Sequence, residues 1–259
     1  MTHPPELVAG VTVPYRVRFD ECGPDGVVRT SALLRYAQDV AWIHSERLGF
    51  DRAWYAQRRL AWVVRAAELG ILADVPLGST LSITTRISGF RKVWARRRTD
   101  AFLPDGTLAM WGHTDWVMTD HRGMPGRVPP EFPAAFTITP GSFEPGRVPL
   151  PPTPESAQRI EMRVRPQDVD PMGHVNNAAY VDYLEESVAA AGEPGREAIH
   201  AAPRRVRIEY VLAATPGSTM SGAAWQLHDA GGDGGGWAWR LTDGDGGPDI
   251  TRGRVLPGV

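Results

Sequence analysis

The stretch RVRPQDVDPMGHVNNAAYVDY, from Arg163 to Tyr183, decides the fold because it repeats RVRFDECGPDGVVRTSALLRY, from Arg16 to Tyr36. When the two are aligned without gaps, 8 of the 21 columns are identical. The identities include the Arg-Val-Arg start, the proline and glycine of a central turn, and the final tyrosine. Proline and glycine at the same offset predict the same turn leading into the same element, twice in one chain.

A proline-rich stretch separates the two repeats. Nine prolines occur in the 26 residues from Pro129 to Pro154, a composition that favours extended, semi-rigid chain. We therefore predict two similar domains, residues 1–132 and 158–259, joined by a linker at 133–157. A chain of 259 residues is long enough for each domain to have its own core.

Each half contains the same order of expected elements. A short strand precedes the turn, and an apolar helix follows it, from Thr30 or Ser31 in the first half and after Asn176 or Asn177 in the second. Either asparagine is suited to cap the second helix. The expected strands are 15–19, 60–67, 80–88, 95–102 and 110–118, then 161–165, 205–212, 220–228 and 237–242. One helix with a run of antiparallel strands predicts an α+β unit, a sheet wrapped around a helix, used twice.

The composition excludes several classes of protein. A net charge of -2 and a pI near 6.4 argue against a nucleic-acid partner, which requires a basic face. The single cysteine, Cys22, excludes a disulfide framework and cysteine zinc sites, and the seven histidines lack metal-binding spacing. No apolar run approaches the roughly 20 residues of a membrane span, and the first residues lack the pattern of a signal peptide. We expect a cytoplasmic protein without a cofactor, a metal or a membrane partner.

Several motifs together carry a family resemblance. The segment DVDPMGHVNNAAYVDYLEES, from Asp168 to Ser187, resembles the signature of hotdog thioesterases. In the first half ECGPDG, LLRYAQDVAWIH, LAWVV and DWVMTD resemble the N-terminal hotdog of plant and bacterial acyl-acyl-carrier-protein thioesterases. The resemblance implies a tandem hotdog that hydrolyses the thioester between a fatty acyl chain and the phosphopantetheine of acyl carrier protein. Such a chain is expected to be a monomer or a homodimer.

The resemblance also implies a catalytic pair, Asp170 as the acid and His174 as the histidine. A carboxylate and an imidazole in one loop before a helix N-terminus suit this chemistry, because they can orient water while the helix end polarises the thioester carbonyl. Met172 stands where the plant enzymes have an asparagine, and Ala213 and Ala214 fall near a glutamate-cysteine pair of the family. The repeat places Asp25 in the column of Met172, which makes Asp25 a third catalytic candidate.

Other residues are candidates for substrate binding. Asn176 and Asn177 adjoin the histidine, although helix capping alone explains an asparagine there. Trp42 and Trp62 are candidate linings of an acyl pocket in the first half. Arg96 and Arg98 belong to the densest basic run, which forms either an ordinary solvated face or a rim that steers an acidic carrier protein toward the site.

Three alternatives stay open. An acyl-CoA thioesterase has the same fold and differs in what carries the thioester. A non-catalytic acyl or carrier-protein binding module is favoured by Met172, Ala213 and Ala214. A hotdog dehydratase rests on the fold alone. The sequence has no Gly-x-Ser-x-Gly elbow, which argues against an α/β-hydrolase triad.

Overall fold

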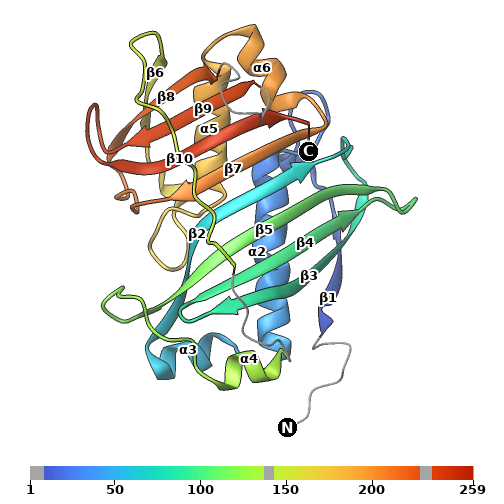
Figure 1. Cartoon of the computed structure of the whole chain (residues 1–259). Coiled ribbons are helices and arrows are strands. Elements are labelled where there is room, and N and C mark those ends of the chain that lie inside the picture. The colour runs from blue at the N-terminus through green and yellow to red at the C-terminus, as the bar shows by residue number, and fades with distance from the viewer. Residues whose placement is uncertain (1–8, 137–142, 228–234, 259) are drawn as a thin grey trace. The chain divides into compact units, whose positions relative to one another are not determined.

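A computed structural model of the chain describes residues 9–136, 143–227 and 235–258 (Figure 1). Contacts between residues divide the chain into two compact units. The first unit consists of Met1–Ala67 and Asp74–Gly146, and the second of Glu68–Ala73 and Arg147–Val259. The division after Gly146 falls inside the expected linker, and strand β2 (Leu60–Ile71) contributes to both units. The domain boundaries drawn from the sequence stay predictions.

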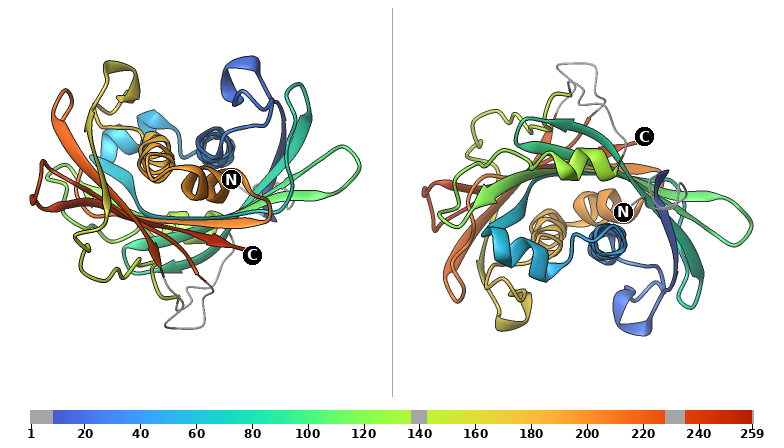
Figure 2. Two further views of the ribbon diagram at one scale, coloured as in Figure 1. Left: turned by 90° about the horizontal axis from the view of Figure 1, so that it is seen from above. Right: turned by 90° about the horizontal axis from the view of Figure 1, so that it is seen from below.

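The first unit is an antiparallel sheet with a long helix against one face. The strands follow the order β1 (Val11–Arg16), β3 (Thr80–Arg91), β4 (Trp94–Phe102), β5 (Leu108–Asp120) and β2. Helix α2 (Thr30–Arg47) packs against β1 and β3, as the two views of Figure 2 show. Its buried residues include Leu33, Tyr36, Ala37, Val40 and His44, which recur at the three- and four-residue spacing of one helix face.

Two short helices complete the first unit, α3 (Arg52–Arg58) and α4 (Glu131–Ala135). Asp51 caps α3, because its side chain accepts a hydrogen bond from the amide of Trp54 at 2.8 Å. Helix α4 is too short to be stable alone. Its Phe132 and the following Phe136 are each 1% exposed. Burial of these two rings is therefore what holds α4 in place.

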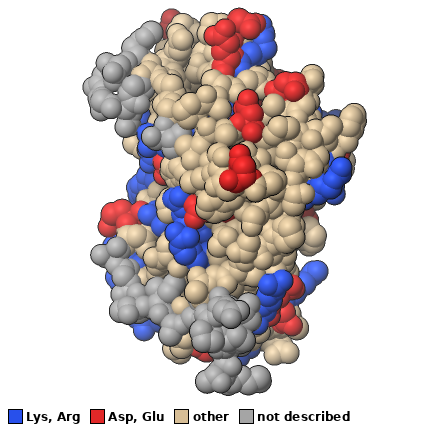
Figure 3. All heavy atoms as spheres, turned by 90° about the vertical axis from the view of Figure 1, so that its right-hand side faces the viewer, with Lys and Arg blue, Asp and Glu red and all other residues tan. Residues whose placement is uncertain are grey.

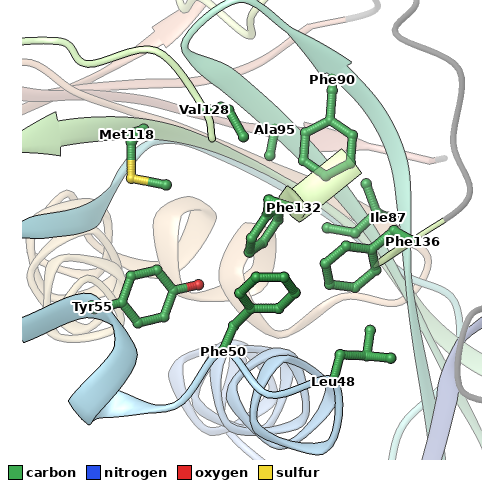
Figure 4. Packing of buried hydrophobic residues seen from close by; sticks show 10 residues of the cluster. All are labelled: Leu48, Phe50, Tyr55, Ile87, Phe90, Ala95, Met118, Val128, Phe132 and Phe136. Atoms are coloured by element: carbon green, nitrogen blue, oxygen red, sulfur yellow. The ribbon is translucent and has the colours of Figure 1, made fainter. Parts of the chain in front are cut away.

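Both rings belong to a buried cluster of the first unit (Figure 4). The cluster consists of Leu48, Phe50, Tyr55, Ile87, Phe90, Ala95, Met118, Val128, Phe132 and Phe136. The ring of Phe132 lies 4.5 Å from that of Phe50 and 5.5 Å from that of Phe90, measured between centroids. Apolar side chains from helices and strands thus form one aromatic core.

The second unit is likewise an antiparallel sheet with a helix against one face. Its strands follow the order β7 (Arg204–Tyr210), β10 (Asp249–Pro257), β9 (Gly236–Thr242), β8 (Thr219–Leu227) and β6 (Gln158–Arg163). Helix α5 (Ala179–Ala189) packs against β6, β8 and β9, and α6 (Glu193–His200) packs against α5. A Cβ atom on Gly253 of β10 would lie 2.7 Å from the Leu184 side chain. Glycine at this position therefore lets α5 lie close to the sheet.

The predicted α+β class is confirmed, and each expected strand overlaps an observed one. The strand expected at 15–19 ends at Arg16, because residues Phe19–Glu21 form a 3-10 turn, η1, and η2 (Pro166–Asp168) is its counterpart in the second half. Strand β10 was not predicted from the sequence, although its burial alternates along much of its length. Helices α3, α4 and α6 were not predicted either, because they are too short for a clear apolar period.

An extended segment of the predicted linker, residues 143–157, follows α4 and leads into β6. Its prolines have no amide hydrogen to donate, so the segment cannot pair as a regular strand of a sheet. Arginine side chains of the strands supply donors instead. They join Arg91 to Phe143 O, Arg96 to Glu144 O, Arg254 to Pro149 O and Arg240 to Pro151 O. The linker is thus fastened to the strands of each unit. No helix in the described part of the chain is long and apolar enough to cross a membrane.

Candidate active site

A tight turn in the second unit brings Asp170 and His174 together. The amide of Asp170 donates to the carbonyl of His174 at 2.8 Å, and Val169 pairs with Val175 as a β-bridge. The carboxylate oxygen Oδ1 of Asp170 accepts the amides of Met172 at 2.8 Å and of His174 at 3.4 Å. Within the described residues no side chain or amide donates to Oδ2, so that oxygen can accept a hydrogen bond from a water.

The two site residues differ in exposure. His174 is exposed and Asp170 is half-buried. Met172, between them, is 61% exposed. Asp170 is therefore oriented by backbone donors, while the imidazole projects at the surface of the turn. Among the described residues, no group of three or more histidine, cysteine, aspartate or glutamate side chains is arranged to hold a metal ion.

The two asparagines lie between this turn and helix α5. Asn176 Oδ1 accepts the amide of Ala178 at 2.9 Å, and Asn177 O accepts the hydroxyl of Tyr210 at 2.9 Å. The expected capping role is wrong, because the N-cap residue is Ala178 and no side chain caps the helix. Through its bond to the Ala178 amide, the Asn176 side chain instead closes a turn immediately before the helix. A role of either asparagine in substrate binding stays a prediction.

The segment after β7 packs against the first turn of α5. The amide of Ala214 donates to the hydroxyl of Tyr180 at 3.0 Å, and Ala214 is 4% exposed. Burial raises the pKa of Tyr180, and the negative charge of Asp170 raises it further. Tyr180 is therefore a neutral hydroxyl beside the site. Ala213 and Ala214 supply neither the acid nor the thiol that the family resemblance implies at this place.

Asp168 was not predicted as a site residue, yet several hydrogen bonds hold its carboxylate next to the turn. It is 6% exposed and accepts hydrogen bonds from Tyr183 OH at 2.6 Å and from Arg165 Nε at 2.9 Å. Burial alone raises the pKa of Asp168, but these hydrogen bonds outweigh it and hold the pKa below its usual value. A signal was present in the repeat, whose arginine and tyrosine columns are identical and whose acidic column holds Glu21 and Asp168.

The third catalytic candidate, Asp25, lies in the equivalent turn of the first unit. It is exposed, and its Oδ1 accepts the amide of Val27 at 3.0 Å. Cys22 pairs with Val28 as a β-bridge, which matches the bridge of the second unit. The turn is thus the same, but Val27 stands where His174 stands in the second half. Cys22 is buried, and burial raises the pKa of its thiol.

The two tryptophan candidates lie in different surroundings. Trp62 packs against the aromatic cluster, and its indole N–H donates to Tyr55 OH at 3.1 Å. Trp42, on α2, is 40% exposed and is not among the residues of that cluster. Both stay predictions as pocket linings.

The basic run on β4 is paired with acidic groups. Arg96 binds both carboxylate oxygens of Asp115, at 2.6 and 2.7 Å. Arg98 and Arg86 both bind Asp100, at 2.7 and 3.0 Å. Figure 3 shows basic and acidic side chains interspersed on one face of the molecule. These pairs reduce the positive charge of the run, and a steering role of Arg96 and Arg98 stays a prediction.

Arg97, between them, is 5% exposed and points into the first unit. It donates to His44 Nδ1 at 3.1 Å and to Ser45 Oγ at 2.9 Å. Burial lowers the pKa of Arg97 to about 10. The guanidinium therefore remains charged at neutral pH, and it lies over the ring of Phe136.

The model of the thioesterase-like superfamily matches residues 164–215, a segment that includes Asp170 and His174. A solved structure of an oleoyl thioesterase from Lactobacillus plantarum has a TM-score of 0.82 at 21% identity, with 96% of this chain and 98% of that chain covered. The 12:0-ACP thioesterase from Umbellularia californica has a TM-score of 0.76 at 20% identity, with 95% and 93% covered. The predicted tandem hotdog is confirmed.

A second family model, the acyl-ACP thioesterase N-terminal domain, matches residues 11–136. The first half of the chain is therefore similar to the acyl-ACP thioesterase family. A chloroplastic acyl-[acyl-carrier-protein] hydrolase of Cuphea viscosissima is 25% identical over 190 residues, which are 67% of this chain and 46% of that protein. The chain thus spans about half the length of this relative.

Proposed function

We propose that the protein hydrolyses the thioester of fatty acyl-acyl carrier protein and releases the free fatty acid. One observation carries the proposal, the turn in which Asp170 and His174 are joined by backbone hydrogen bonds at the entrance to helix α5. The family match to an acyl-ACP thioesterase domain supports the same substrate. We further propose a cytoplasmic location and a monomeric or homodimeric state.

The chemistry requires a water molecule, a proton acceptor and a proton donor. Water adds to the thioester carbonyl, its proton is taken up, and the C–S bond breaks as the leaving thiolate gains a proton. In the proposal Oδ2 of Asp170 orients the attacking water, and the imidazole of His174 accepts and returns the proton. Asp170 suits this role because two amides already fix its Oδ1.

Asp25 is proposed as an additional acidic group of the reaction. The support is its place in the repeat, where it occupies the column of Met172. Unchanged turnover in Asp25→Asn would remove it from the proposal.

The proposed partner is acyl carrier protein with its phosphopantetheine-linked acyl chain. Arg86 and Arg98 share the single carboxylate of Asp100, so this group of three side chains has a net positive charge. The carrier is acidic, and an excess positive charge at the surface speeds encounter with it. Arg98→Gln should therefore raise KM for carrier-bound substrate in low salt and leave KM for a free thioester, which carries no acidic carrier, unchanged.

A second candidate function is a non-catalytic acyl or carrier-protein binding module. The observation in its favour is that Ala214 bonds Tyr180 of α5 and that neither Ala214 nor the preceding Ala213 carries an acid–base or nucleophilic group. Binding of acyl carrier protein without turnover would support this candidate.

The test is thiol release from acyl carrier protein and CoA carrying the same acyl chain. Faster release from the carrier, judged by kcat/KM, supports the proposal. Faster release from CoA would identify an acyl-CoA thioesterase, and no release with retained binding would identify a binding module.

A further inference from the structure

Asp168 joins three parts of the second unit at one carboxylate. Oδ2 accepts the amide of Arg165 at 3.1 Å as well as Arg165 Nε and Tyr183 OH, and Oδ1 accepts Arg165 Nη2 at 3.1 Å. Arg165 follows strand β6, and Tyr183 lies on helix α5. The carboxylate therefore ties the strand and the helix to the start of the turn between them.

The backbone carries this constraint directly to the proposed site. The carbonyl of Asp168 accepts the amide of Asn176 at 2.8 Å, the Val169–Val175 bridge follows, and Asp170 bonds His174. These contacts form successive rungs of one small hairpin. Asp168 anchors its base, and Asp170 and His174 lie at its last rung.

The first unit contains the same arginine–acid–tyrosine group, but the turn next to it has no histidine. Tyr36 OH donates to Glu21 Oε2, and Arg18 binds Glu21 through its amide at 2.8 Å and its guanidinium at 3.1 Å. The turn that follows ends in Val27 where the second ends in His174. The repeat of the arginine–acid–tyrosine group shows that it builds the turn, and only the second turn holds an imidazole.

We propose that Asp168 and Tyr183 are positioning residues for the thioesterase site and hold the turn that carries Asp170 and His174. The inference rests on the proposed function. Asp168 has no access to a substrate, because it is 6% exposed and its oxygens are occupied by Arg165 and Tyr183. It acts through the hairpin, where small displacements of reacting groups are costly to the rate.

Tyr183→Phe removes only the hydroxyl and leaves Asp168 bonded to Arg165. At metal sites, loss of a hydrogen-bonded group that orients a ligand typically costs 10- to 100-fold in affinity or activity, and we take an effect of the same order for this turn. We expect a fall of about that size in kcat, with KM within about twofold of the parent value. Ser187→Ala is the matched control for kcat, because Ser187 lies one turn further along α5 and its buried hydroxyl bonds Tyr183 O and Trp239 Nε1. It should lower stability and leave kcat within about twofold.

Hydrogen exchange measures positioning without any turnover. Tyr183→Phe should speed amide exchange in residues 169–176, whereas Tyr36→Phe should speed exchange in its own turn and leave 169–176 unchanged. Parental exchange at 169–176 in Tyr183→Phe, or a loss of kcat in Ser187→Ala equal to that in Tyr183→Phe, would overturn the proposal. If the parent protein releases no thiol, the proposed function fails, and the exchange data alone decide whether the pair holds the turn.

Discussion

Replacement of Phe132 by alanine is the sharpest test of the first unit's packing. The ring is 1% exposed and lies within 5.5 Å of the rings of Phe50, Trp62, Phe90 and Phe136, measured between centroids. A buried aromatic side chain removes about 150–250 Å² from water, which at about 25 cal/mol per Å² corresponds to about 4–6 kcal/mol. Measured Phe→Ala losses in cores are about 3–5 kcal/mol. We expect Phe132→Ala to lower the free energy of unfolding by about 4 kcal/mol.

Urea denaturation followed by tryptophan fluorescence measures this loss, because Trp54 and Trp62 pack against the same cluster. Phe19→Ala is the control, since that ring is 85% exposed and its removal should change stability by less than about 0.5 kcal/mol. In a thermal scan the same 4 kcal/mol corresponds to a fall in Tm of about 8–16 °C. A loss below about 1 kcal/mol would refute the reasoning, because it would mean that Phe132 does not fill the cluster and does not hold α4.

Two further predictions concern buried polar groups of the first unit. Arg96→Met should lower the free energy of unfolding by about 3–5 kcal/mol, because the Asp115 side chain is 3% exposed and loses its bidentate partner. Arg196→Met removes a pair exposed at both ends and should cost less than about 1 kcal/mol, so equal losses in urea denaturation would contradict the argument. Burial raises the pKa of Tyr55 from 10.0 to about 12, so the folded chain keeps a proton that the unfolded chain loses. The resulting stabilisation of the folded chain is fully present below pH 10 and is lost as the pH rises toward 12. By pH 11 the free energy of unfolding has fallen by about 1.4 kcal/mol. The stability difference between the parent and Tyr55→Phe should therefore shrink by that amount between pH 9 and pH 11, and a constant difference would show that Tyr55 does not titrate this way.

The repeat explains why the fold was predictable. Turn residues at a fixed offset and one apolar helix in each half were enough to indicate two similar α+β units. Helix α4 was missed because its stability comes from the packing of Phe132 and Phe136 against residues that are distant in sequence. Helix α5 begins at Ala179, beyond the asparagines expected to cap it, because Asn176 closes a turn of its own.

The site was predictable only in part. Asp170 and His174 lie in one turn and are close in sequence, so their proximity follows from local structure. The pairing of Arg96 with Asp115 depends on the register of β4 against β5, which places the two residues opposite each other. Sequence patterns do not determine that register, so the basic run looked more exposed than it is. Asp168 was missed because its role depends on a hydrogen bond from Tyr183, which lies 15 residues further along the chain on another element.

The central claim is that the turn of the second unit performs the hydrolysis, and turnover of acyl-acyl carrier protein by Asp170→Asn and His174→Ala tests it most directly. Asp105→Asn and His121→Ala are matched controls. Asp105 accepts the amide two residues ahead, at 2.9 Å, as Asp170 does, and His121 is likewise exposed. Since general acid–base groups contribute about 10²–10⁴-fold, each site variant should lose at least about 100-fold in kcat while both controls keep parental rates. Parental turnover in either site variant would contradict the account and move the chemistry away from this turn.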